Sequence, residues 1–105
     1  MKEQVMGQGY ELSLVFISEE ESQELNLAHR KRDKPTNVLS FPLDKNTGEI
    51  FICLPYAKSE APEFDRDYKN FVGFLFIHGL MHLKGYDHGS TMEFEEAKVR
   101  EQFGI

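Results

Sequence analysis

The chain has 105 residues, a formal net charge of −6 and one cysteine, Cys53. This length predicts a single domain over residues 1–105, because it is too short for two independent hydrophobic cores. One cysteine excludes an internal disulfide. The acidic balance argues against a protein that coats nucleic acid without specificity.

The longest apolar stretch, residues 71–77, is well short of the roughly 20 residues that cross a bilayer. The N-terminus alternates polar with apolar residues and lacks the apolar core of a signal peptide. We therefore expect a cytoplasmic protein without a membrane segment.

Three strands are predicted in the first half of the chain. Polar and apolar residues alternate over 10–17, and one face of this strand would carry Leu12, Leu14 and Phe16. Residues 37–42 and 49–54 are also typical of short strands. The polar segment 44–48 between them ends in glycine and predicts a turn, so these two strands should form a hairpin.

A first helix is expected to begin at Ser18, because Ser18 and Glu21 have the spacing of a capping box. It should end before Pro35. Its apolar face would be modest, formed by Leu25, Leu27 and Ala28. The proline-containing segment 56–67, further along the chain, is expected to be a loop or an irregular helix.

Residues 68–84 predict a helix that is apolar nearly all round and is therefore buried. Ser90 and Glu93 repeat the capping-box spacing, so a last helix should begin there. It would run to Phe103 and be closed by Gly104. The order of elements predicts an α+β fold.

Three histidines are spaced H-x3-H-x5-H in the segment HGLMHLKGYDH. His78 and His82 lie one helical turn apart and can direct two imidazoles at one ion. The chain must turn to bring His88 to the same ion, and Gly85 permits that turn. Three protein ligands leave a fourth position for water, so the pattern predicts a catalytic metal site at the C-terminal end of the buried helix.

Each residue around this motif has a plainer interpretation. His78 and His82 could be half-buried helix residues that bond to backbone carbonyls, which would leave His88 unexplained. Gly79 replaces the glutamate base of H-E-x-x-H peptidases and disfavours that mechanism. It could leave space beside the metal or allow close helix packing.

Two acidic residues near the motif are candidates for chemistry. Asp87 could orient a ligand imidazole or could be a turn residue. Glu93 could act as a base, although its capping-box position explains it without chemistry.

A basic cluster follows the first helix and is a candidate phosphate-binding surface: Arg30, Lys31, Arg32 and Lys34. Cations at a helix C-terminus also complement its dipole, so structure alone could account for them. Arg30 is the candidate for stabilising charge on a phosphate, since arginine binds phosphate in a bidentate geometry.

Three blocks in order resemble the bacterial rRNA maturation endoribonuclease family, YbeY: LNLAHRKRDKPTNVLSFP at 25–42, GEIFI at 48–52, and the histidine segment. The resemblance implies a small mixed sheet with helices on its faces. It also implies that His78, His82 and His88 bind one divalent ion, zinc, and that Arg30 lies in the same cleft and contributes to catalysis or RNA binding. Asn37 and Glu49 stand where the family has aspartates, and the segment between residues 54 and 68 is short for the family.

By this resemblance we expect a metal-dependent, single-strand endoribonuclease acting in processing of ribosomal RNA and in quality control of the small ribosomal subunit. Two other functions stay open. A non-catalytic assembly factor could use the metal to organise its fold and the basic cluster to dock on RNA. A peptide or small-molecule metallohydrolase is disfavoured by Gly79.

Overall fold

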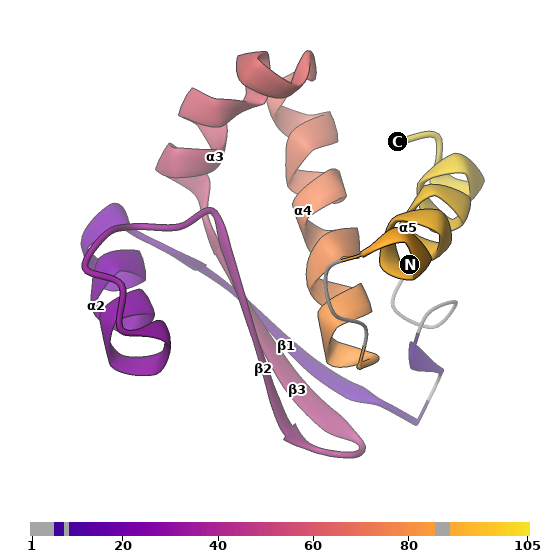
Figure 1. The fold of residues 1–105 in the computed structure, drawn as a ribbon, viewed down its shortest axis with the longest axis horizontal. Helices are drawn as coiled ribbons and strands as arrows, with labels where there is room; N and C mark the ends of the chain where they lie inside the picture. The colour runs from indigo at the N-terminus through magenta and orange to yellow at the C-terminus, as the bar shows by residue number, and fades with distance from the viewer. Residues whose placement is uncertain (1–5, 8, 86–88) are drawn as a thin grey trace.

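The computed structural model describes residues 6–7, 9–85 and 89–105. Figure 1 shows a small sheet, with α2 and α5 on opposite sides of α4 in this view. The elements in chain order are β1 (Glu11–Ile17), α2 (Glu19–Arg30), β2 (Val38–Asp44), β3 (Thr47–Cys53), α3 (Leu54–Glu60), the 3-10 helix η1 (Ala61–Phe64), α4 (Tyr68–Leu83) and α5 (Ser90–Phe103).

The sheet is three-stranded and mixed, in the order β1-β3-β2. β3 pairs parallel with β1 and antiparallel with β2, so the predicted hairpin and the α+β class are confirmed. Helix α4 packs on β2 and β3, and α5 packs on α4. The side chains of Ile50 and Ile52 on β3 and of Phe71 on α4 are fully buried in this core. Within the described residues, no helix is both long and apolar enough to cross a membrane.

The prediction that Leu12, Leu14 and Phe16 share one face of β1 is confirmed by the register, but the second half of this face is poorly buried. Leu14 is 42% exposed and Phe16 is 53% exposed. In the register of the sheet they lie beside Ile50 and Ile52. β1 is one of the two edge strands, and α4 packs on the other two strands of the sheet, which leaves this end of β1 less covered.

The predicted capping box of α2 is confirmed, because Ser18 Oγ accepts from Glu21 N–H at 3.1 Å and Glu21 Oε1 accepts from Ser18 N–H at 3.1 Å. Its predicted apolar face is wrong: Leu27 is 48% exposed and Ala28 is exposed. The residues that α2 buries are instead polar, Ser22 and Asn26.

These two polar side chains hold the segment that follows α2. Ser22 Oγ donates to Thr36 O at 2.7 Å and accepts from Thr36 N–H at 2.9 Å. Asn26 Nδ2 donates to Lys34 O at 2.8 Å. A buried polar group is stable when it is hydrogen-bonded, so α2 is anchored through polar contacts to residues 34–36 rather than through an apolar face.

The later helices lie close to where the sequence predicts them. The segment 56–67, expected to be a loop or an irregular helix, forms most of α3 and all of η1, and each of these helices has a proline in its first turn. Helix α5 ends at Phe103, with Gly104 in the left-handed conformation as predicted (φ 71°). The helix begins at Ser90, where its start was predicted, with Gly89 as the N-cap; the side chain of Ser90 lies outside the described part of the chain, so the capping box stays a prediction.

Candidate functional site

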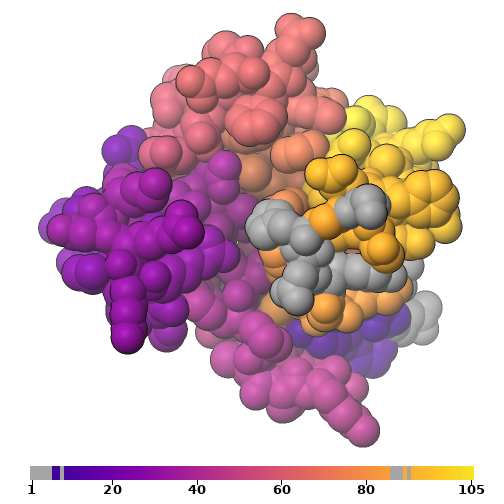
Figure 2. Space-filling view, in the orientation of Figure 1, coloured from indigo at the N-terminus to yellow at the C-terminus, as the bar shows by residue number. Residues whose placement is uncertain are grey.

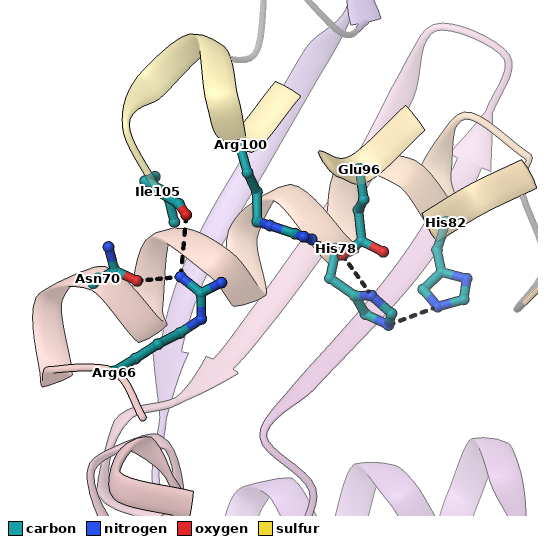
Figure 3. A network of polar contacts seen from close by, with 7 residues as sticks. All are labelled: Arg66, Asn70, His78, His82, Glu96, Arg100 and Ile105. Carbon is teal, nitrogen blue, oxygen red and sulfur yellow. Dashed lines mark hydrogen bonds and ion pairs between the residues drawn. The ribbon is translucent and has the colours of Figure 1, made fainter. Parts of the chain in front are cut away.

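Helix α4 directs two imidazoles at one another. The Nε2 atoms of His78 and His82 lie 3.1 Å apart, and the two rings are nearly perpendicular, at 86° (Figure 3). Helix α4 ends at Leu83, and Gly85 has a positive φ of 103°, as expected if the chain turns after the helix. The third histidine, His88, and Asp87 lie outside the described residues.

Gly79 is the residue that lets α4 lie close to the sheet. A Cβ at this position would lie 2.9 Å from Ser40 Oγ on β2 and 3.1 Å from Ile50 Cδ1 on β3. Ser40 Oγ also donates to Gly79 O at 3.1 Å. The close-packing interpretation of this glycine therefore holds, and this packing brings the turn that carries His78 and His82 against β2.

Glu96 on α5 is a site residue that the sequence did not predict. It is 4% exposed, and its Oε1 lies 3.0 Å from His78 Nδ1 (Figure 3). The guanidinium of Arg100, one turn further along α5, approaches the same carboxylate at 3.9 Å. One signal was available: Glu96 shares a helical face with Met92 and Val99, so a carboxylate occupies an otherwise apolar position.

This contact fixes which nitrogen of His78 can bind a ligand. A carboxylate only accepts hydrogen bonds, so Nδ1 of His78 donates to Glu96, and in the neutral ring Nε2 then presents a lone pair. Metal-binding histidines are commonly held in this way by a carboxylate on the second nitrogen. Glu93, the other acidic candidate on α5, is exposed and lines a neighbouring hollow.

The two described histidines fit a metal ion. Two nitrogens bound tetrahedrally to one zinc at about 2.0–2.1 Å lie about 3.3 Å apart, close to the 3.1 Å between the Nε2 atoms of His78 and His82. The tautomer that Glu96 imposes on His78 is also the one that binds a metal. These side chains are thus a suitable pair of ligands, to which His88 would add a third.

Arg30 lines the same hollow as the two histidines. This hollow, which we name the catalytic hollow for the role proposed for it, has a volume of about 180 Å³ and is lined by Arg30, Thr36, Asn37, Val38, Ser40, His78 and His82. Arg30 is the last residue of α2, and Lys31, Arg32 and Lys34 are exposed on the segment that follows. In the space-filling view, α2 and this segment form one side of the face and α5 forms the other (Figure 2).

Known proteins share the sequence and the fold of this chain. A family model described as "Endoribonuclease YbeY" matches residues 1–103. This chain belongs to the YbeY family. It is 36% identical to Endoribonuclease YbeY of Staphylococcus carnosus, over 98% of this chain and 72% of that protein. It is 39% identical to that of Colwellia psychrerythraea, over 93% of this chain and 71% of that protein.

The fold is also that of a solved structure. The solution structure of TM1509 from Thermotoga maritima matches with a TM-score of 0.67 and 32% sequence identity, covering 97% of this chain and 76% of that one. The α+β architecture expected from the YbeY resemblance is therefore confirmed.

Asn37 is a departure from the YbeY pattern that the structure explains locally. Its Nδ2 donates to Glu60 Oε1 on α3 at 2.8 Å. An aspartate here would place two acceptor-only carboxylates against each other, whereas the amide of Asn37 supplies the donor that Glu60 needs. The hydrogen bond between Asn37 and Glu60 thus connects α3 to the start of β2 beside the catalytic hollow.

Proposed function

We propose that this protein is a metal-dependent endoribonuclease that acts in processing of ribosomal RNA. The observation that carries the proposal is that Arg30, His78 and His82, which come from two helices far apart in the sequence, line one hollow. Membership of the YbeY family supports the same reaction.

The chemistry of the hollow suits a phosphodiester. A zinc ion held by His78, His82 and His88 would supply a water that ionises near neutral pH and a positive charge for a phosphate oxygen. The guanidinium of Arg30 would bind a second oxygen of the same phosphate and stabilise the negative charge that develops on it. Glu96 would hold the proton on His78 Nδ1 and keep that ring in its binding orientation.

Other parts of the proposal extend from the same site. We propose that single-stranded regions of ribosomal RNA in the small subunit are the substrate, and that the protein acts in quality control of that subunit in the cytoplasm. The exposed cations Lys31, Arg32 and Lys34 would contact phosphates outside the hollow, where they would contribute to affinity rather than to cleavage.

Arg30 provides the test. If it stabilises developing charge, Arg30→Ala should lower single-turnover cleavage at saturating RNA by about 10²–10³-fold, while binding weakens far less. Arg30→Lys should restore binding better than cleavage, because lysine keeps the charge but not the bidentate geometry. Arg32→Ala is the matched control and should change only binding and its salt dependence.

The same measurements separate this proposal from its main alternative. A non-catalytic assembly factor would bind RNA or small subunits yet cut nothing when fully loaded with metal, and Arg30→Ala would then affect binding alone. A peptidase is disfavoured, since Gly79 leaves the usual position of the glutamate base without a side chain.

A further inference from the structure

A second and larger hollow adjoins the catalytic hollow. Its volume is about 440 Å³, against about 180 Å³ for the catalytic hollow. Asn37 and His78 line both, so the two are contiguous at these residues. A bound polymer that places one group in the catalytic hollow can therefore place a neighbouring group in the larger hollow.

Aromatic rings form one wall of this larger hollow. Phe64 of η1 stacks on Phe71 of α4, with ring centroids 5.0 Å apart and an interplanar angle of 24°, and Phe71 stacks on Phe74 at 5.8 Å and 14°. Phe71 is fully buried, whereas Phe64 is 49% exposed. Phe64 thus presents aromatic surface at the edge of a stack whose inner ring is held by the core.

The cations near this wall are already engaged. The guanidinium of Arg100 lies 5.1 Å from the centre of the Phe74 ring and 3.9 Å from the Glu96 carboxylate. That of Arg66 lies 4.6 Å from the same ring, and its NH1 donates to the Asn70 side chain and to the Ile105 carbonyl (Figure 3). Neither arginine is placed as a dedicated partner for an anion.

The polar lining of the hollow also disfavours an anion. Two carboxylates, Glu93 and Glu96, line it together with Arg100 and the amide of Asn37. A phosphate would meet repulsion from both carboxylates. A neutral, planar group with N–H donors would instead stack on the aromatic wall and donate to the exposed carboxylate of Glu93.

We propose that this hollow binds one unstacked nucleobase of the RNA, next to the phosphate held in the catalytic hollow. The proposal rests on the proposed function, because contiguity with the phosphate site identifies the occupant as RNA. The base stacks on Phe64, and Asn37, with Glu93, contacts its hydrogen-bonding edge. Proteins that recognise single-stranded RNA commonly hold splayed bases on aromatic side chains.

The first experiment measures binding of a short single-stranded RNA that contains one cleavage site. Phe64→Ala should raise its dissociation constant by roughly 5- to 150-fold, the range for loss of one base stack. Phe64→Tyr, which keeps a ring, should restore binding, and Phe64→Leu, which keeps only apolar volume, should not. Phe94→Ala is the matched control, since Phe94 is 64% exposed on α5 and lies outside the residues that line this hollow.

The second experiment asks whether Phe64 acts on a single base. Abasic nucleotides are placed one at a time along the same RNA. An abasic nucleotide at one position next to the cleaved bond should weaken binding to the wild type, and the same change should cost Phe64→Ala less affinity than it costs the wild type. Removing both partners of one contact gives this non-additive result.

The outcomes are distinct. If the wild type binds and cuts the RNA while Phe64→Ala behaves like Phe94→Ala, or if every abasic effect adds to that of Phe64→Ala, the base site is overturned and the proposed function stands. If the wild type neither binds nor cuts single-stranded RNA, the proposed function itself fails and the base site fails with it. Thermal unfolding of each variant shows whether a loss of binding comes from loss of the fold.

Discussion

Glu96 Oε1 lies 3.0 Å from Nδ1 of His78, and this contact joins α5 to the proposed metal ligands on α4. The carboxylate is buried, so the imidazole is its natural partner in a place where an unpaired charge would be costly. The last helix is therefore part of the site, although His78 and His82 both belong to α4.

The first prediction is that Glu96→Gln weakens the affinity for zinc by about 10–100-fold, the usual effect of losing a carboxylate behind a ligand imidazole. Competition with a chelator measures the affinity directly, without RNA. Glu95→Gln is the matched control, because Glu95 faces Lys98 at 3.7 Å instead. Equal affinities for Glu96→Gln and the control would mean that Glu96 has no role in metal binding.

The second prediction concerns the ligands themselves. Purified protein should contain about one divalent ion per chain, and His82→Ala should lose most of it, because two remaining ligands hold zinc weakly. His29→Ala serves as the control, since the His29 ring is exposed and packs near Phe41, at 4.6 Å between centroids. Elemental analysis that finds unchanged metal in His82→Ala would rule out the three-histidine site.

The third prediction is that Gly79→Ala destabilises the protein, because the added methyl group would overlap Ser40 and Ile50. Overpacking of this kind costs about 1–3 kcal/mol, partly offset by about 1 kcal/mol from the better helix propensity of alanine. Gly73→Ala in the same helix gains the same propensity and meets only the terminal side chain of Ile105. Denaturant unfolding should therefore show Gly79→Ala to be the less stable of the two variants.

The fourth prediction follows from the buried thiol of Cys53. Burial raises the pKa of this thiol above its ordinary value of 9.0, the charge of Glu19 raises it slightly further, and a backbone hydrogen bond at Tyr56 opposes the change. The folded state thus favours the neutral thiol. Below pH 9 the thiol is neutral in both states, so it does not change the free energy of unfolding. Above pH 9 the thiol ionises first in the unfolded chain, so the free energy of unfolding falls as the pH rises.

The variant Cys53→Ala tests whether Cys53 causes this fall in the free energy of unfolding. Between about pH 9 and pH 10 the slope should be up to about 1.4 kcal/mol per pH unit steeper in the wild type than in Cys53→Ala. Burial also raises the pKa of Tyr10 from 10.0, which adds a similar loss at higher pH in both proteins. Parallel curves for the two proteins would show that Cys53 titrates alike when folded and unfolded.

The elements that could be predicted from the sequence are those governed by local rules. The capping box at Ser18, the turn between β2 and β3, and the left-handed Gly104 each depend on a few neighbouring residues. Helix α4 was predictable because a helix that is apolar all round has to be buried. The i, i+4 spacing then placed His78 and His82 together.

What could not be predicted depends on contacts between distant elements. The partner of His78 is 18 residues further along the chain, and its position depends on how α5 packs on α4. The exposure of Leu14 depends on which strands of the sheet α4 covers. The burial of Ser22 depends on the path of the segment around Thr36, which satisfies its hydroxyl.

The polar anchoring of α2 affects the order in which parts of the protein open in heat or denaturant. The position of Arg30 relative to the two histidines depends on bonds from Ser22 and Asn26 to the following segment, whereas the histidines belong to a helix packed in the core. Regions with few apolar contacts open at lower free energy than the core. Arg30 should therefore separate from the two histidines before the sheet unfolds, so that the proposed catalytic geometry is lost while the protein is still folded.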